Sequence, residues 1–309
     1  MSTHLVVGSG PIGVHTARLL ADRGESVRMI TRSGGGPEHE SIERVAADAS
    51  DARRLTDLTA GAEVLYNCAN PKYTEWEQKW FPMNDAMIAA AKATDAVYAI
   101  TGNLYVYGPQ PGGYMREDTP MAAVGRKGKV RIKMWRDALA SGVRTVEARG
   151  SDYVGAGAVG IFSFALLPAI AKGRAALIPG DPNAPHSFTY TGDMARTLVT
   201  LAGDERAWGK AWHVPTAAPI SIREMADRYC ALTGVPRLTM RKIPRWANHT
   251  AGHFNAMLRE TAEMDYQFYF PFHLDSTLTE QTFGLTPSPI EVGLRETAED
   301  AERIAARAM

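Results

Sequence analysis

The sequence predicts an α/β protein with a doubly wound parallel sheet and a smaller C-terminal lobe whose segments interleave with that sheet. The first observation is a series of short apolar runs, at 5–7, 27–30, 43–46, 63–66, 97–101 and 143–148. The second is the set of helical patterns between them, at 51–60, 74–93 and 129–141. Such alternation is typical of a parallel sheet covered by helices on both faces.

A glycine-rich turn follows the first apolar run. Gly8, Gly10 and Gly13 enclose Pro11 and Ile12, and Val14, Ala17 and Leu20 then recur at helical spacing. Glycines between a strand and a helix allow a tight turn, a close approach to a pyrophosphate and close packing of the helix. We therefore expect a Rossmann fold in which these five residues bind a dinucleotide.

The end of the second apolar run bears on the choice of dinucleotide. The chain reads Thr31-Arg32-Ser33 where an acidic residue would hold the ribose 2′-hydroxyl of NAD. Arg32 is a planar cation suited to a 2′-phosphate, and Ser33 adds a hydroxyl. We expect NADP(H) rather than NAD(H), with a solvated arginine as the alternative.

The pattern changes after Arg149, where glycine and proline become frequent. We expect residues 1–150 to form the dinucleotide-binding domain and residues 151–309 to form mainly a substrate lobe. Within that lobe, 188–215 is expected to return to the sheet, with a helix near 192–202 and a strand near 211–214. Helices are also expected at 221–233 and from Pro289, with an aromatic, loop-rich tail between them.

Composition limits the classes of partner. Lys+Arg and Asp+Glu both total 34, so the chain has no overall charge that favours nucleic acid or a membrane surface. No stretch reaches about 18 uninterrupted apolar residues, and no leader precedes the first strand. The two cysteines, Cys68 and Cys230, are far apart and indicate a reducing compartment without a metal site. We expect a cytoplasmic protein with a small-molecule substrate, which could act as a homodimer.

Several ordered motifs resemble the extended short-chain dehydrogenase/reductase family, with sugar-nucleotide epimerases and dehydratases nearest. They are "GSGPIG", "ADASD", "CANPK", Asn84, "ITGNLYVYG", "REDTP", "RGSDYVGAG" and "FTYTGDMA", and they span about two thirds of the chain. The resemblance implies that Asp48 contacts the adenine and that Ala69, Asn70 and Lys72 border the nicotinamide ribose and phosphates. Asp48 could instead cap a helix, and Lys72 could be solvated.

The chain departs from this family at the catalytic positions. The family's serine or threonine matches Asn103, and its Tyr-x-x-x-Lys segment should lie in "GRKGKVRIKMWR", residues 125–136, which contains no tyrosine. Two registers are open: Lys127 with Arg131, or Lys129 with Lys133. We expect at least one of Lys129 and Lys133 to reach the cofactor. The alternative is that these lysines lie on a solvated basic face of the helix.

Other side chains could replace the missing phenol or contact substrate. Tyr105 is a candidate acid/base, and a buried lysine such as Lys127 could serve instead. Tyr153, Asp152 and His186 are expected near the substrate. His186, His213 and His273 are the histidines that could titrate near neutrality, and His186 is favoured among them for a role in the site.

These features favour an atypical NADP(H)-dependent oxidoreductase acting on a small, largely apolar or aromatic substrate. The absent tyrosine leaves two alternatives: a non-redox cyclase, isomerase or lyase, or a cofactor-sensing regulatory protein. A nucleotide sugar is not expected, because His186 stands where the resembling epimerases use an arginine to hold the diphosphate. The tail also offers aromatic residues in that region, namely Phe254, Phe268, Tyr269, Phe270 and Phe272.

Overall fold

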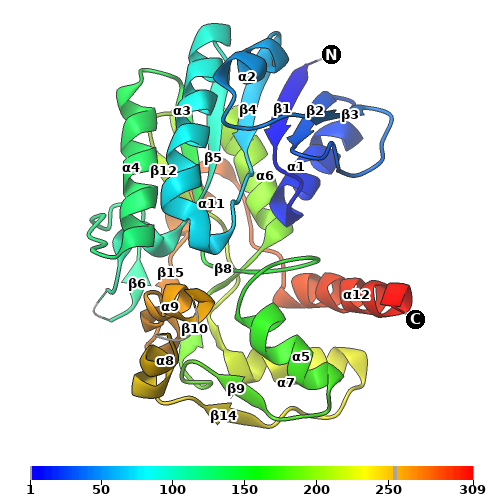
Figure 1. Cartoon of the computed structure of the whole chain (residues 1–309), viewed down its shortest axis with the longest axis vertical. Helices are drawn as coiled ribbons and strands as arrows, with labels where there is room; N and C mark the ends of the chain where they lie inside the picture. Colours follow the sequence, from blue (N-terminus) through cyan, green and yellow to red (C-terminus); the bar gives the residue numbers. More distant parts are fainter. Residues whose placement is uncertain (1, 111, 253–255, 309) are drawn as a thin grey trace.

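Seven parallel strands form the central sheet of the computed structural model, which describes residues 2–110, 112–252 and 256–308. Their order is β12-β7-β5-β4-β1-β2-β3, so the chain reverses direction across the sheet between β1 and β4 (Figure 1). Ligands of such sheets bind beyond the carboxyl ends of the strands at this reversal. The strands are β1 (Thr3–Val7), β2 (Ser26–Thr31), β3 (Ile42–Ala46), β4 (Ala62–Asn67), β5 (Val97–Asn103), β7 (Thr145–Gly150) and β12 (Ala211–His213).

Helices cover both faces of the sheet, which confirms the predicted fold class. Successive strand residues point to opposite faces, so Val6 packs in the cluster containing α1 and α6, while Leu5 and Val7 pack in the cluster containing α2, α3 and α4. The first pair is α1 (Pro11–Asp22) and α6 (Thr191–Ala202). The second group is α2 (Ala52–Thr59), α3 (Trp76–Thr94) and α4 (Arg126–Ala140).

One of these helices begins earlier than its apolar pattern predicts. We expected a helix from residue 129, whereas α4 starts at Arg126 with Gly125 as its N-cap. The backbone N–H of Lys127 donates to Glu263 Oε1 at 2.9 Å, so a carboxylate from a distant segment satisfies a donor of the first turn. Tertiary capping of this kind leaves no local signal in the sequence.

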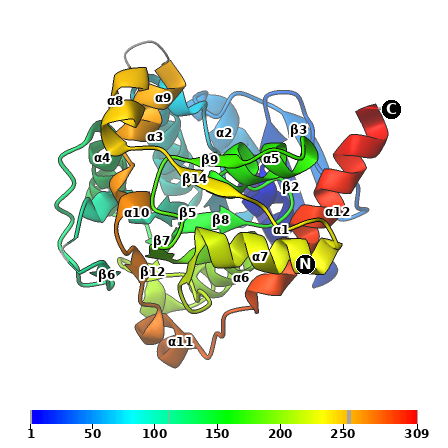
Figure 2. The same cartoon turned by 90° about the horizontal axis from the view of Figure 1, so that it is seen from below.

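A smaller lobe lies below the sheet in Figure 1 and is seen from beneath in Figure 2. Its apolar core joins Phe162, Met225 and Leu294, which come from three separate helices. The helical segments are η3 (Phe162–Leu166), a π-helical turn, α5 (Leu167–Ala171), α7 (Ile222–Thr233) and α12 (Ile290–Ala308). The paired short strands are β8 (Asp152–Val154) with β11 (Phe188–Tyr190), β9 (Ala176–Ile178) with β14 (Met240–Lys242), β10 (Pro185–His186) with β13 (Ile220–Ser221), and β15 (His273–Leu274) with β6 (Tyr114–Met115).

The described part of the tail, which we expected to be rich in loops, contains four short helices. They are α8 (Arg245–Gly252), α9 (Ala256–Ala262), α10 (Tyr266–Tyr269) and α11 (Thr277–Phe283). Each has eight residues or fewer, which is shorter than the window in which helical periodicity becomes visible. Short helices of this kind depend on tertiary contacts rather than on their own propensity. Single 3₁₀ turns complete the chain at η1 (Tyr73–Glu75), η2 (Leu104–Tyr107) and η4 (Glu205–Ala207).

A buried network of hydrogen-bonded polar groups connects β7 to η2, β12 and the tail. Arg149 donates through Nε to Glu147 Oε2 at 2.7 Å and through NH1 to the Tyr107 hydroxyl at 3.1 Å. The Tyr107 hydroxyl lies 2.7 Å from His213 Nε2, and His213 Nδ1 lies 2.8 Å from the Asp275 carbonyl oxygen. Since a carbonyl only accepts, Nδ1 carries the hydrogen and Nε2 accepts from Tyr107. Burial lowers the pKa of His213 to about 3, so this imidazole is neutral.

Replacing Arg149 tests the contribution of this hydrogen-bond network to stability. Arg149→Met leaves the carboxylate of Glu147 buried without its cation, and should lower the free energy of unfolding by about 3 to 5 kcal/mol. The measurement is urea denaturation followed by circular dichroism. Arg136→Met, on the exposed face of α4, is the control and should change stability by no more than about 0.5 kcal/mol. A loss below about 1 kcal/mol for Arg149→Met would contradict this account.

Candidate functional site

The carboxyl end of β1 is shaped by the glycine turn. Gly8 has φ +105°, and a Cβ there would lie 2.6 Å from the carbonyl oxygen of Cys68. A Cβ at Gly13 would overlap the carbonyl oxygen of Gly8. Gly10, by contrast, is the N-cap of α1 and a Cβ there would meet nothing within 4 Å. Two glycines thus permit close packing, and the third leaves open space in front of a helix N-terminus, as a pyrophosphate requires.

Arg32 and Ser33 lie exposed where β2 ends. Asp48 is also exposed, and its Oδ1 accepts hydrogen bonds from the backbone N–H of Ser50 at 2.9 Å and from its hydroxyl at 2.7 Å. The Ser50 backbone N–H is the main cause that holds the pKa of Asp48 below its usual range, and the positive charges of Lys79 and Arg32 add to it. Asp51, rather than Asp48, caps α2.

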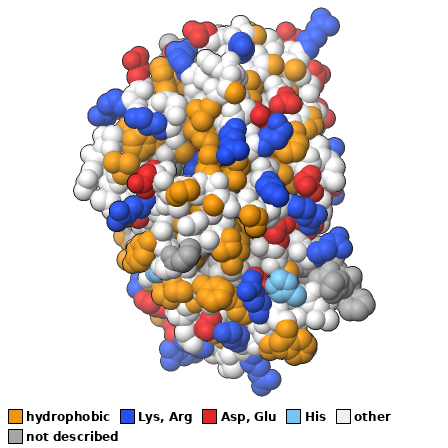
Figure 3. Space-filling model, turned by 90° about the vertical axis from the view of Figure 1, so that its left-hand side faces the viewer, with side chains coloured by type: hydrophobic (Ala, Val, Ile, Leu, Met, Phe, Trp, Pro, Cys, Tyr) orange, Lys and Arg blue, Asp and Glu red, His pale blue; other side chains and the backbone are white. Residues whose placement is uncertain are grey.

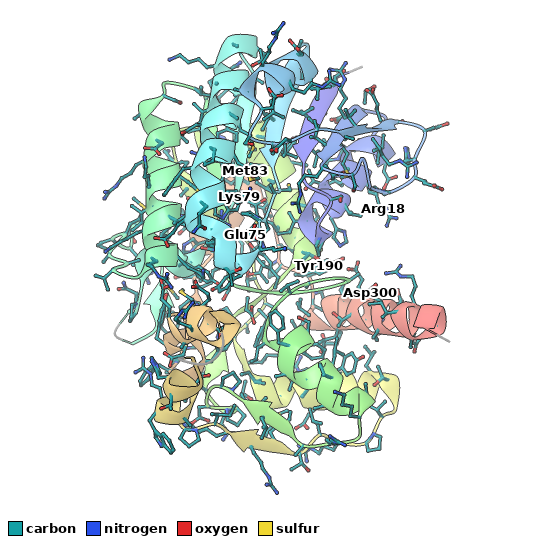
Figure 4. All side chains as sticks on the ribbon, in the orientation of Figure 1. Arg18, Glu75, Lys79, Met83, Tyr190 and Asp300 are labelled. Atoms are coloured by element: carbon teal, nitrogen blue, oxygen red, sulfur yellow. The ribbon has the colours of Figure 1, made fainter. Side chains whose placement is uncertain are left out.

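The loop after β4 passes beneath the glycine turn. Ala69 packs against Gly8, while Asn70 and Lys72 are exposed. Lys72 forms an ion pair with Glu75 at 3.8 Å. Glu75, the N-cap of α3, is followed at intervals of four residues by Lys79 and Met83 on α3 itself, and the three lie along one side of the helix (Figure 4). Ala69, Asn70 and Lys72 therefore sit at the same edge as the glycine turn.

Helix α4 resolves the two registers that the sequence leaves open. Lys127 and Arg131 are 3% and 5% exposed, whereas Lys129 and Lys133 are exposed. Lys133 pairs with Asp137 at 2.7 Å along the helix surface. Lys127 and Arg131 therefore point inward, whereas Lys129 and Lys133 lie on the exposed face of α4, and the expected contact of Lys129 or Lys133 with the cofactor stays a prediction.

The exposed face of α4 carries the rest of the basic cluster. Figure 3 shows Lys and Arg side chains interspersed with hydrophobic ones on the side that α4 faces. A surface hollow of about 520 Å³ lies there, lined in part by Lys129, Lys133, Arg136 and Ile132. The cluster is thus divided between a solvated face and an inward face.

Lys127 is held by the C-terminal lobe. Its Nζ donates to Glu260 Oε2 and to the carbonyl oxygen of Tyr73, both at 2.6 Å, and lies 4.0 Å from the centre of the Tyr73 ring. Arg126 donates to Glu260 Oε1 at 2.9 Å. Glu260 on α9 therefore neutralises two cations at the start of α4, and it carries no motif that could have identified it from sequence.

Arg131 and Tyr105 lie near the carboxyl end of β5. Arg131 NH1 donates to the carbonyl oxygen of Thr101 at 3.1 Å, and the guanidinium packs 4.8 Å from the Trp76 ring. Asn103 Oδ1 accepts from the backbone N–H of Tyr105 at 3.2 Å, which starts η2. Burial is the main cause that raises the pKa of Tyr105, while a hydrogen bond from Tyr73 and the charge of Arg131 oppose it. The phenol is protonated at neutral pH.

Asp152 and Tyr153 border this group from β8. The Tyr153 hydroxyl donates to the carbonyl oxygen of Gly102 at 2.9 Å, and Asp152 Oδ2 accepts from the backbone N–H of Ile161 at 3.2 Å. Burial raises the pKa of Asp152 to about 7, and its negative charge raises that of Tyr105. Asp152 therefore changes protonation near neutral pH.

His186 is buried in an aromatic environment. It is 1% exposed, and its ring lies 5.0 Å from that of Phe268 and 5.3 Å from that of Phe272. Its Nδ1 lies 3.0 Å from the carbonyl oxygen of Gln267, so Nδ1 donates. Burial lowers the pKa of His186 to about 4 and that of His213 to about 3, and it also lowers the pKa of His273. His186 and His213 are therefore neutral at neutral pH.

Helix α12 packs against α1 and against the loop that follows β8. The Tyr190 hydroxyl donates to Glu296, and Glu296 Oε2 lies 3.3 Å from His15 Nε2 on α1. Asp300 Oδ2 accepts from the backbone N–H of Gly157 at 2.8 Å. Tyr190 and Asp300 lie where α12 meets the rest of the molecule (Figure 4). The last helix thus contacts both the glycine-turn helix and the loop after β8.

The parallel sheet, the reversal at β1 and β4 and the glycine turn define a nucleotide-binding α/β protein. A family model described as NAD dependent epimerase/dehydratase family matches residues 4–214. The chain belongs to this family, which confirms the resemblance drawn from its motifs.

Solved structures of low sequence identity share the fold. WbmH from Bordetella bronchiseptica, in complex with NAD+, has a TM-score of 0.78 at 19% identity and covers 98% of this chain and 99% of its own. UDP-glucose 4-epimerase from Thermotoga maritima, with UDP-glucose, has a TM-score of 0.80 at 13% identity and covers 98% and 99%. dTDP-glucose 4,6-dehydratase from Bacillus anthracis, in complex with NAD, has a TM-score of 0.77 at 14% identity, and the match covers 98% of this chain and 97% of the dehydratase chain. A search of curated proteins found no match.

Two further features concern metals and membranes. Among residues 2–110, 112–252 and 256–308, no three His, Cys, Asp or Glu side chains converge to hold a metal ion. Over the same residues, no helix combines the length and apolar character needed to cross a membrane.

Asp152→Asn should alter stability in a pH-dependent way. Because the pKa of Asp152 is raised from 3.8 to about 7 on folding, the folded protein holds a proton that the unfolded chain releases between these values. The stabilising contribution is complete below the unfolded pKa and is lost as pH rises through the folded pKa. Compared with the unsubstituted protein, the variant should therefore gain roughly 1 to 3 kcal/mol of unfolding free energy between about pH 5 and pH 8.

Urea denaturation at several pH values provides this measurement. Asp118→Asn, at an exposed position, serves as the control and should follow the unsubstituted protein at each pH. Parallel pH dependence of the Asp152→Asn variant and the unsubstituted protein would show that the carboxyl group of Asp152 is not desolvated on folding.

Proposed function

We propose that the protein is an NADP(H)-dependent oxidoreductase that acts on a small, largely apolar or aromatic carbonyl compound without a tyrosine on α4. The observation that carries this proposal is the glycine turn at the same sheet edge as Asn103, Tyr105 and Arg131. A bound nicotinamide would supply hydride chemistry, and the protein needs only to orient the substrate and move a proton.

Roles within the site follow from the contacts. Among the described residues, the Asn103 side chain forms a hydrogen bond only through its oxygen, to Tyr105, so its NH₂ donors are available. Asn103 can therefore donate to a substrate carbonyl, while the Tyr105 O–H delivers a proton to the same oxygen. Arg131 supplies positive potential beside it. Lys127, neutralised by Glu260, is assigned to holding α9 against α4 rather than to proton transfer.

The preference for NADP(H) rests on charge at the end of β2. Arg32 is exposed there with Ser33 beside it, and Lys79 on α3 faces the same carboxylate of Asp48. Two cations near one position favour a dianionic phosphate over a hydroxyl. The similar structures described above contain NAD where a dinucleotide is named, so the proposed NADP(H) preference would distinguish this chain from them and is open to direct test.

The substrate class is inferred from His186 and its surroundings. A neutral imidazole enclosed by Phe188, Phe268 and Phe272 cannot provide the permanent charge that a diphosphate requires. Phe270 is exposed, Tyr269 donates to the carbonyl oxygen of Ile243, and Phe254 lies outside the described residues. The aromatic enclosure supports an apolar substrate portion near His186.

A second candidate function is favoured by the absence of tyrosine from α4. A cyclase, isomerase, lyase or cofactor-sensing protein on the same scaffold would not need that phenol. We further propose that residues 1–150 bind the cofactor and that residues 151–309 mainly bind the substrate. We also propose that the protein is cytoplasmic, that it could form a homodimer, and that it does not bind nucleic acid.

Hydride transfer is tested directly with the purified chain. Oxidation of NADPH and of NADH is followed by absorbance with a panel of aromatic ketones, quinones, enones and imines. Consumption of NADPH with at least one panel member supports the proposal. Binding of NADPH without consumption by any member would favour the second candidate instead.

Arg32→Ala tests the dinucleotide preference. Loss of a charge-assisted contact to the 2′-phosphate should weaken NADP binding by about 1.5 to 3 kcal/mol and leave NAD binding nearly unchanged. Calorimetric titration with both dinucleotides provides the measurement. Equal losses for NADP and NAD would contradict a role for Arg32 in recognising the 2′-phosphate.

UDP- and dTDP-sugars should not bind measurably at about pH 7.5, because burial keeps His186 neutral and a neutral imidazole does not provide the permanent charge that a diphosphate requires. The measurement is a calorimetric titration in the presence of saturating NADP. Micromolar affinity for any of these compounds would overturn the inferred substrate class.

A further inference from the structure

A short glycine-rich loop crosses the start of α1. This loop, the strap, comprises residues 155–160 with the sequence GAGAVG and leads from β8 to η3. A Cβ at Gly157 would lie 3.4 Å from Cγ of Pro11, which is the first residue of α1. In Figure 1 the loop runs between α1 and α12. The strap therefore borders the helix N-terminus at which Gly10 faces open space.

One face of α12 holds the strap in place. Thr297 Oγ1 accepts a hydrogen bond from the backbone N–H of Gly155 at 3.2 Å, and Asp300 Oδ2 accepts one from that of Gly157 at 2.8 Å. Glu296 lies beside them, since a Cβ at Gly155 would be 3.4 Å from Glu296 Oε2. Residues three or four apart on a helix share a face, so these three side chains form one contact surface.

The hydrogen bonds of the strap are concentrated on α12. Within the described part of the chain, those that residues 155–159 form outside the strap all go to α12. A further bond is internal, from the backbone N–H of Ala158 to the carbonyl oxygen of Gly155 at 3.2 Å. Val159 is 64% exposed. The bond to Asp300 is the stronger of the two to α12, because an ionised acceptor strengthens a hydrogen bond.

Both ends of the strap are anchored by other contacts. Before it, β8 pairs with β11, and after it the backbone N–H of Ile161 donates to Asp152 Oδ2 at 3.2 Å. Between these ends, Gly155 and Gly157 adopt φ angles of +134° and +67°, a region that glycine populates at no steric cost. Segments with few buried contacts open locally at a lower free-energy cost than the whole protein. Release of the α12 contacts would therefore free the middle of the strap and leave its ends in place.

We propose that the strap is a gate over the dinucleotide site and that Thr297 and Asp300 of α12 are its latch. With the latch closed, the strap borders the space in front of Gly10 at Pro11, and it must move aside before a pyrophosphate can reach or leave that space. The gate rests on the proposed binding of a nicotinamide dinucleotide, but it requires neither hydride transfer nor a preference for NADP(H).

Rapid mixing with NADPH, followed by nicotinamide fluorescence, tests the gate. A gate that is closed both before and after binding sets the rates of association and dissociation and leaves the affinity nearly unchanged. Asp300→Ala removes a hydrogen bond to a charged acceptor, and should raise both rate constants at least about tenfold while changing the dissociation constant by less than about threefold. Thr297→Val removes a neutral acceptor and should raise both by a smaller factor. Glu299→Ala, at an exposed position of the same helix, is the control and should bind as the unsubstituted protein does.

Proteolysis without dinucleotide tests the latch separately. Elastase cleaves after small apolar residues, which the strap offers at Ala156, Ala158 and Val159, and cleavage follows the population of the open form. Mass spectrometry of the fragments should show cleavage within residues 155–160 at least about tenfold faster for Asp300→Ala than for the unsubstituted protein. Asp300→Asn keeps an acceptor oxygen and should be cleaved more slowly than Asp300→Ala.

Three outcomes would overturn the gate. They are unchanged cleavage of the strap in folded Asp300→Ala, a rise in its dissociation rate constant alone, and failure of the unsubstituted protein to bind either NADPH or NADH. If NADH binds in place of NADPH, the same rate constants are measured with NADH. Dinucleotide binding without consumption by any compound of the substrate panel would overturn the proposed function, and faster rates and cleavage in Asp300→Ala would then leave the gate standing.

Discussion

The close crossing of the backbone at Gly8 with the end of β4 is the constraint on which the site depends. Gly8 lies against Cys68 and Ala69, and Gly13 lies against Gly8, with no room for a side chain at either glycine. This contact brings the start of α1 to the carboxyl edge of the sheet and lets β4 and β5 end directly beside it. Asn103, the last residue of β5, then lies at the same carboxyl edge of the sheet as the start of α1.

The basic stretch at 125–136 illustrates how one charged segment can serve two structural purposes. Its inward cations meet protein groups: Lys127 meets Glu260, and Arg131 meets the Thr101 carbonyl oxygen and two indole rings. Its outward cations lie on an exposed helix face. Glu263 adds a carboxylate at the N-terminus of α4, where the helix dipole favours negative charge. Charged contacts of Glu260 and Glu263 therefore hold the C-terminal lobe against the N-terminal end of α4.

Local patterns made the sheet predictable, whereas contacts between distant residues did not leave such patterns. The glycine turn and the alternating apolar runs are properties of adjacent residues, so the fold class and its sheet helices could be inferred. The register of α4 could not, because Lys127 and Lys129 differ by only two positions and the partner Glu260 is 133 residues from Lys127. The burial of His186 among rings from α10 and β11 could not be inferred either, because those rings come from distant parts of the sequence.

Helix α12 has a consequence for how the protein is made. Its Glu296 reaches His15 and Tyr190, and its Asp300 receives the backbone N–H of Gly157. Domains emerge from the ribosome in order, and N-terminal parts generally fold first. The glycine turn can therefore form before α12, the helix that supports α1 from the other lobe, has been translated. Until α12 has docked, α1 lacks its contact with Glu296, and the two lobes are not yet joined at this point.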